Sequence, residues 1–226
     1  MEKKKNNGLV KAMSYCHKCG IKLPDEEGIK FCPNCGTPLP HTIIVRKKKE
    51  TVFQRHRIIA FLIVFALCVI ATVIGASTQL SSQDAQQINR EMRELEEAVK
   101  GSNPQFASRF IFGNNFMHTL IMFIPVVGPC WGFFVLYNTG VAIAAISTIN
   151  NINPMFSLFS LFLFPFTWME YVSYALAISE SCILTYFLFK RKLRDEITKM
   201  AIMVVVCSVI LLLAAIIETA FISLII

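Results

Sequence analysis

The sequence predicts an all-α polytopic membrane bundle of about five transmembrane helices, some of them broken by Pro or Gly, preceded by a small cysteine-rich module. Composition is the first observation behind this prediction: 54% of the residues are hydrophobic, only 16% are charged, and the mean hydropathy is +0.55. Long uncharged runs are the second, and two close pairs of cysteines are the third. Since a soluble domain is about one quarter charged, this composition excludes a water-soluble globule, a disordered chain and an extracellular disulfide scaffold.

The N-terminal part of the chain is a basic head. Its first 57 residues hold 13 of the 22 Lys and Arg residues but only five of the 15 acidic ones. We expect a disordered basic tail at 1–13, the cysteine-rich module at 14–40 and a basic cytosolic linker at 41–57. Nucleic acid, anionic lipid and the signal that orients a membrane protein would each account for the positive charge.

The cysteine-rich module predicts a metal site. It contains Cys16-His-Lys-Cys19-Gly and Cys32-Pro-Asn-Cys35-Gly, separated by 12 residues. Two such pairs supply four thiolates in a tetrahedron, the arrangement that Zn²⁺ prefers. The module resembles the short zinc ribbons at the ends of many prokaryotic membrane and regulatory proteins. We expect one structural Zn²⁺, because no ligand position is left for a catalytic water; disulfides, the alternative, are disfavoured in a reducing cytosol.

Three apolar regions predict an integral membrane domain at 58–226. Ile58–Ala76 has 19 residues without a charge, about the minimum length for a spanning helix. Phe110–Phe189 is almost continuously apolar but interrupted by Pro, Gly and Asn, and it is long enough for three spans. Met200–Ile226 is the last apolar run. Together these regions give about five spans.

The polar segment between the first two apolar regions predicts an amphipathic helix at about 83–100. Its apolar residues, spaced three and four apart, form one narrow stripe: Ala85, Ile88, Met92, Leu95 and Val99. We expect this helix to lie on the bundle or on the lipid headgroups. A coiled-coil-like contact with a second copy or a partner is the alternative.

The distribution of Lys and Arg predicts the orientation in the cell membrane. Residues 41–57 carry six basic side chains and 190–199 carry five, whereas 77–109 carry four together with five acids. Basic loops stay in the cytoplasm, so the first two segments are expected inside and the third outside. We therefore expect a multi-pass protein with a cytoplasmic N-terminus and an external C-terminus.

Polar side chains within the apolar regions are the candidate functional residues of the membrane body. They are Asn114, Asn115, Asn138, Glu170, Glu180 and Glu218. A carboxylate at membrane depth is costly unless it is protonated, paired or near an interface, which makes it a functional candidate. Placement at a headgroup region is the alternative for Glu170 and Glu218.

Four motifs occur in a characteristic order: Phe110-Ile-Phe-Gly-Asn114-Asn115, Tyr137-Asn138-Thr-Gly140, Pro165-Phe-Thr-Trp-Met-Glu170 and Ala214-Ala-Ile-Ile-Glu218-Thr-Ala-Phe221. Over residues 52–226 this pattern resembles the stage II sporulation protein M family of prokaryotic membrane proteins. The family's third motif is Pro-His-Gly-x-x-Glu. This chain retains Glu170 but has Phe166 and Thr167 in place of the His and Gly, so it cannot use that His in proton or metal chemistry.

The resemblance implies a membrane scaffold, since the family is known in sporulating bacteria for holding peptidoglycan-remodelling enzymes during engulfment. Relatives also occur in organisms that never sporulate, including archaea. The sequence has no His-Glu-x-x-His motif, no phosphate-binding Gly-rich loop and no nucleophile–base set. We expect a non-enzymatic scaffold or complex subunit that recruits membrane or envelope proteins, or a second copy of itself, through its spans, outer helix and zinc ribbon. Nucleic acid is the less favoured partner.

Two other functions are open to this sequence. A transporter or channel would use Glu170, Glu180 and Glu218 in a site between broken helices. An intramembrane enzyme would use the carboxylates as acid and base. Convergence of the three carboxylates on a hydrated cavity would favour transport, whereas separate hydrogen-bonded pockets would favour a scaffold.

Overall fold

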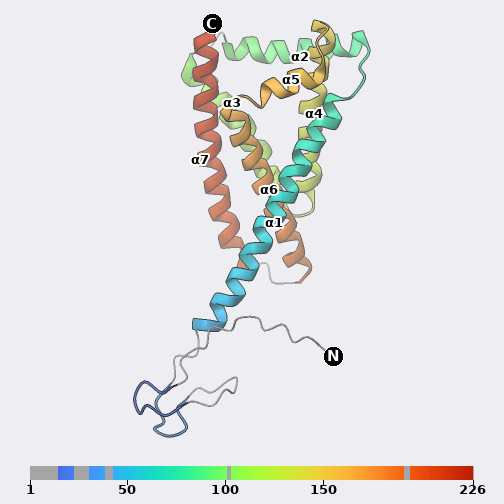
Figure 1. Cartoon of the computed structure of the whole chain (residues 1–226). Helices are drawn as coiled ribbons and strands as arrows, with labels where there is room; N and C mark the ends of the chain where they lie inside the picture. Colours follow the sequence, from blue (N-terminus) through green and yellow to red (C-terminus); the bar gives the residue numbers. More distant parts are fainter. Residues whose placement is uncertain (1–14, 23–30, 39–42, 101–102, 191–193, 226) are drawn as a thin grey trace, which may run out of the picture. The chain divides into compact units, whose positions relative to one another are not determined.

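Helices make up most of the described chain outside the cysteine-rich module. The computed structural model describes residues 15–22, 31–38, 43–100, 103–190 and 194–225, and Figure 1 shows their course. The helices are α1 (Ile43–Ala76), α2 (Ser82–Lys100), α3 (Pro104–Met122), α4 (Val127–Asn150), α5 (Pro154–Leu161), α6 (Pro165–Phe189) and α7 (Arg194–Ile225). The chain divides into two units, Met1–His56 and Arg57–Ile226. The tail expected at 1–13 lies outside the described residues.

The membrane unit is a bundle in which successive long helices alternate in direction. In Figure 1, α1, α3, α4, α6 and α7 run between the two ends of the unit, while α2 and α5 lie at one end, here called the α2 end. The opposite end holds the turn between α3 and α4, the end of α6 and the start of α7. It is called the Arg57 end, after the residue at which the membrane unit begins.

Four of these helices are long and apolar enough to cross a membrane: Arg55–Ala76 of α1, α4, α6 and Glu196–Leu224 of α7. The expected number was about five, and the difference is α3. This helix has 19 residues but carries Arg109, Asn114, Asn115 and His118, which lower its hydropathy. It nevertheless runs through the bundle with the others (Figure 1), because part of its polar surface packs against neighbouring helices instead of lipid.

The segment expected to be a linker is helical. The basic run from Ile43 to Arg57 belongs to α1 and continues without interruption into the first span. Lys, Arg, Glu and Gln are good helix formers, and a helix that is already nucleated in the membrane propagates through them readily. The boundary expected at residue 58 is therefore not a boundary in secondary structure.

Prolines divide the region from 104 to 189 by starting helices rather than by kinking them. Pro104, Pro154 and Pro165 stand in the first turns of α3, α5 and α6, where the missing N–H is not needed. Asn103 and Asn153 cap the first two of these helices through side-chain oxygens that accept from Gln105 and Met155 amides. Of the three spans expected here, only α4 and α6 are long and apolar enough to cross a membrane; the region also contains α3 and, between α4 and α6, the short helix α5.

Small residues allow the helices to approach closely. A Cβ on Gly75 would lie 2.0 Å from the Tyr137 carbonyl oxygen, and one on Gly140 would lie 2.1 Å from that of Thr72. At these glycines the backbones of α1 and α4 are in direct contact. Small residues commonly allow membrane helices to pack in this way. Gly132 similarly lets α4 meet Ile178 of α6, which is fully buried.

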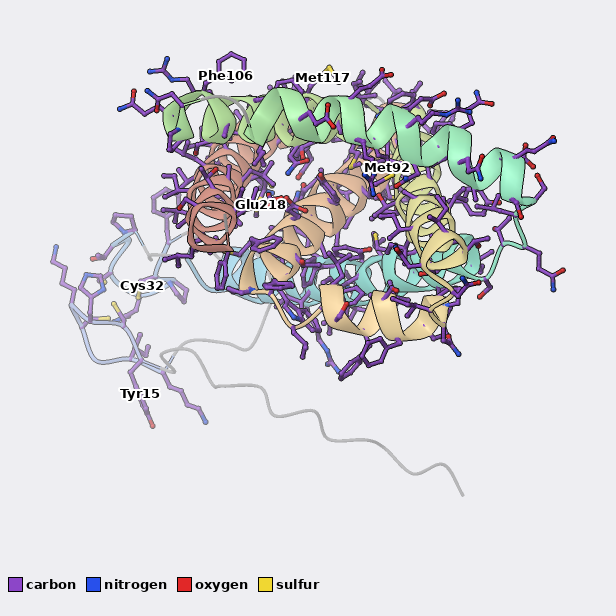
Figure 2. All side chains as sticks on the ribbon, turned by 90° about the horizontal axis from the view of Figure 1, so that it is seen from above. Tyr15, Cys32, Met92, Phe106, Met117 and Glu218 are labelled. Atoms are coloured by element: carbon purple, nitrogen blue, oxygen red, sulfur yellow. The ribbon has the colours of Figure 1, made fainter. Side chains whose placement is uncertain are left out.

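The outer amphipathic helix, expected at about 83–100, is α2. Ala85 is fully buried, and Ile88 and Met92 are half-buried. Figure 2 places Met92 between α2 and α4, while the charged side chains of α2 point away from the bundle. The described part of the stripe thus packs on the bundle; the side chains of Leu95 and Val99 lie outside the described residues.

Candidate functional sites

The four cysteines of the N-terminal unit lie together. All four Sγ atoms are within 4.8 Å of one another, with 3.7 Å between Cys16 and Cys35 and 3.6 Å between Cys19 and Cys32. Zinc–sulfur bonds of about 2.3 Å in a tetrahedron require sulfur–sulfur distances of about 3.8 Å. The cluster therefore fits one structural Zn²⁺, which these four residues would hold.

The two halves of the cluster repeat one local structure. The amide of Gly20 donates to the Cys16 carbonyl oxygen, and that of Gly36 to the Cys32 carbonyl oxygen, each at 2.9 Å. Both glycines have a left-handed backbone, with φ of 70° and 66°, which is strained for other residues. The glycine after each cysteine pair is therefore required by the turn that brings the sulfurs together.

The cysteines of the second pair differ in acidity. Hydrogen bonds from the side chain and backbone of Thr37 lower the pKa of Cys35 to about 6, and the Thr37 hydroxyl lies 3.2 Å from its sulfur. Burial raises the pKa of Cys32 to about 11. Zinc must displace a proton from Cys32 at neutral pH, so metal binding by this ribbon releases protons and weakens as the pH falls.

Two of the three candidate carboxylates meet inside the bundle. Glu170 of α6 accepts a hydrogen bond from the Asn115 amide of α3. Glu218 of α7 is close enough to Glu170 to interact with it electrostatically, and Figure 2 places it between α7 and α6. Three helices thus contribute one polar group each to the same place.

Two tyrosines that the sequence analysis did not single out accompany this pair. Tyr174, one helical turn after Glu170, is 6% exposed and interacts electrostatically with both carboxylates. The hydroxyl of Tyr171 lies 2.7 Å from that of Thr72 and joins α6 to α1. The spacing of four residues from Glu170 to Tyr174 was the available signal, because such residues share a helix face.

Glu180 belongs to a different site, at the Arg57 end. Arg57 of α1 donates from one nitrogen to both oxygens of Glu180, at 2.9 and 3.0 Å, and also pairs with Glu196 of α7. Lys199 lies 3.0 Å from the other oxygen of Glu196. Ten residues separate Glu170 from Glu180, which is about 15 Å along a helix. The three carboxylates therefore do not converge.

The remaining asparagines are exposed. The Asn138 amide donates to the Phe134 carbonyl oxygen of its own helix at 2.7 Å. The side chain of Asn114 is exposed and makes no hydrogen bond within the described part of the chain, and a Cβ on neighbouring Gly113 would meet nothing within 4 Å. Asn114 is therefore a polar group on an open surface of α3.

Comparisons with known proteins agree with these features. A protein-family model for the zinc-ribbon domain matches residues 15–39, which include all four clustered cysteines. The model for Stage II sporulation protein M matches residues 59–223, close to the range of 52–226 expected from the motifs. Searches of curated proteins and of solved structures find no match. The Stage II sporulation protein M model covers most of the chain, and the chain has helices apolar enough to span a membrane. The chain therefore belongs to the stage II sporulation protein M family and carries an N-terminal zinc ribbon.

Proposed function

We propose that the chain is a non-enzymatic membrane scaffold or complex subunit that recruits partner proteins through its spans, α2 and its zinc ribbon. The observation that carries this proposal is the exposed side-chain amide of Asn114, which makes no hydrogen bond among the described residues. In hydrocarbon an unsatisfied polar group is costly, and Asn side chains in membranes commonly bond across helices. A partner helix against α3 would supply the missing hydrogen bond.

The surface around Asn114 suits such a partner. Three apolar side chains lie exposed on the same side of α3: Phe106 (54%), Phe110 (41%) and Met117 (49%). Figure 2 shows Phe106 and Met117 pointing away from the bundle. Gly113 adds a point where a second helix can approach the backbone. We name this surface, formed by Phe106, Phe110, Gly113, Asn114 and Met117, the α3 face.

The proposed orientation places α2 and α5 outside the cell and the Arg57 end in the cytoplasm. The basic segments 41–57 and 190–199 support it, because basic loops are retained inside, and in sequence these segments include Arg57 and directly follow the end of α6 at Phe189. The zinc ribbon would then contact cytosolic partners, while the C-terminus would be external. No catalytic step is assigned to the chain, so any envelope chemistry would belong to a partner enzyme.

Transport through the candidate carboxylates receives less support. That function needs a continuous path, yet Glu180 is bound to Arg57, while Glu170, which interacts with Glu218, lies about 15 Å further along α6. Separate, partnered carboxylates are the arrangement expected of a structural bundle.

Photocrosslinking in intact membranes tests the proposal. A photoreactive amino acid at Met117 should yield a crosslinked protein, and Asn114→Leu in the same chain should reduce its yield severalfold. Asn138→Leu is the matched control, because this exposed amide is satisfied within its own helix; it should leave the yield unchanged. Recruitment through the α3 face would be contradicted if Met117 crosslinked to lipid alone. It would also be contradicted if Asn114→Leu and Asn138→Leu gave the same yield of crosslinked protein.

A further inference from the structure

Exposed residues of α3 recur at the spacing of a coiled-coil seam. Five of them follow one another at intervals of four, three, four and three positions: Phe106, Phe110, Gly113, Met117 and Leu120. A repeat that averages about 3.5 residues keeps one stripe of a helix against a second helix along its length. The α3 face, which Leu120 extends at 42% exposure, is therefore suited to a helix that lies lengthwise on it.

Two polar residues flank this stripe on opposite sides. Arg109 directly precedes Phe110, and Asn114 directly follows Gly113; with Phe110 and Gly113 at heptad positions a and d, they occupy g and e. Both are exposed, and neither side chain makes a hydrogen bond or ion pair among the described residues. An Arg side chain only donates hydrogen bonds, whereas an Asn side chain also has an oxygen that accepts them. Five positions place the two residues about 140° apart around the helix, so they do not meet within one chain.

A second copy of the chain brings these two positions together. Copies of one membrane protein insert with the same orientation, so a two-fold symmetric pair places its two α3 helices side by side and in the same direction. In a parallel two-stranded coiled coil, a g residue of one helix faces the e residue five positions further along the other. Arg109 and Asn114 have this spacing, and the two-fold symmetry forms the contact twice.

We propose that the α3 face binds the same face of a second copy, with Arg109 of each chain donating to the Asn114 side-chain oxygen of the other. The proposal rests on the proposed function, because it names the partner that the α3 face recruits. A second copy is favoured over an unrelated helix, since it supplies a complementary group for both polar residues at once. Gly113, where a Cβ would meet nothing within 4 Å, lets the two backbones approach each other.

Mixed copies of the full chain in native membranes test this pairing. One copy carries Arg109→Leu, the other carries Asn114→Leu and a different tag, and both have a photoreactive amino acid at Met117. A pair of unlike copies keeps one Arg109–Asn114 contact and leaves neither group unpaired, whereas each pair of like copies leaves two polar side chains unsatisfied. Crosslinks between unlike copies should therefore exceed the sum of the like-copy crosslinks severalfold, while random pairing makes the two equal.

A mixture of copies with Arg90→Leu and with Asn138→Leu is the matched control, because these exposed residues lie on α2 and α4. It should pair at random and crosslink as well as wild type. All four substitutions change exposed side chains, so the thermal unfolding midpoints should stay at the wild-type value.

The identity of the crosslinked product separates this proposal from the proposed function. In the wild type, Met117 should crosslink to a second copy of the chain. Crosslinks only to a different protein would overturn the pairing of two copies but leave the scaffold function standing, and crosslinks to lipid alone would overturn both. Random pairing of the Arg109→Leu and Asn114→Leu copies would overturn the contact between these two residues.

Discussion

Asn114 and Asn115 are adjacent in the sequence yet have opposite environments. Successive residues of a helix point about 100° apart, so Asn115 reaches Glu170 inside the bundle while Asn114 stays exposed on α3. The motif that contains both residues identified them as functional candidates without separating their roles. Only the rotation of α3 against α6 and α7, which depends on packing between distant segments, assigns one to an interior site and the other to a surface.

The zinc ligands, by contrast, were fully predictable. Their spacing in the sequence already specifies two tight turns, and the structure brings all four sulfurs together. Local geometry decides this site, so no long-range contact had to be known. What spacing could not show is the unequal acidity of the thiols, which depends on Thr37 and on burial.

At the residue scale, Thr37→Val should make zinc binding more sensitive to acid. Loss of the hydroxyl raises the pKa of Cys35, since that hydrogen bond stabilises the thiolate, and protons then compete with zinc at a higher pH. A titration that follows zinc release on acidification should show its midpoint shifted upward by a few tenths of a pH unit.

Ile21→Val is the matched control for this measurement, because Ile21 follows the first cysteine pair at the position where Thr37 follows the second. Its midpoint should not move. A midpoint in Thr37→Val that is unchanged or lower than in the wild type would show that the Thr37 hydroxyl does not stabilise the Cys35 thiolate.

Arg57 shows what the sequence could not reveal about single residues. It stands in a basic segment that was assigned to orientation, yet it forms a buried ion pair with Glu180, more than one hundred positions away. For Glu180 a pairing was one of the arrangements that the sequence left open, beside protonation and a place near an interface, and several basic residues were available as partners. The choice among them is made by the packing of α1 against α6 and α7.

Arg57→Met should destabilise the membrane unit by about 3 kcal/mol, because removing one member of a buried ion pair leaves an uncompensated charge. Arg57 and Glu180 are only 14% and 4% exposed. Denaturation in detergent should measure the loss, and Arg57→Met combined with Glu180→Gln should recover part of it. Arg90→Met, which changes an exposed residue of α2, is the control. If Arg57→Met and Arg90→Met lowered the unfolding free energy equally, the stabilising role of the Arg57–Glu180 pair would be refuted.

At the scale of elements, the sequence predicted helix types better than helix numbers and ends. The amphipathic stripe located α2 within one residue of its observed start, whereas the prolines were interpreted only as interruptions, although Pro154 and Pro165 begin α5 and α6. The continuation of α1 into the basic head was missed, since charge was interpreted as a linker signal although the same residues favour helix. The polar character of α3 was visible in the sequence, but its place in the bundle was not.

Close contact between α1 and α4 predicts the effect of enlarging Gly140. In Gly140→Val the new Cβ would lie 2.1 Å from the Thr72 carbonyl oxygen, so the two helices must separate and the unfolding free energy should fall by roughly 1–3 kcal/mol or more. Thermal unfolding in detergent measures this change. Gly113→Val is the control, because its Cβ would meet nothing within 4 Å; similar losses in both variants would contradict the close packing of α1 and α4.

On the scale of the whole molecule, the family and its membrane character followed from motif order and hydropathy, and both are confirmed by the family match and the long apolar helices. The arrangement of the polar residues was not predictable, because each polar site joins helices far apart in the chain. Three consequences result: Glu180 is tied to Arg57, Glu170 meets Glu218, and Asn114 is left on the surface. The last of these leads to the proposed scaffold function.

The mass of the particle extracted from native membranes with a copolymer, without detergent, tests that function most directly. Native mass spectrometry should find the 25.5 kDa chain together with at least one further protein chain, either a partner or a second copy. Asn114→Leu should shift the population towards single chains, while Asn138→Leu should not. If the wild-type particle contains one chain with lipid only, the scaffold function and the role of the α3 face are contradicted.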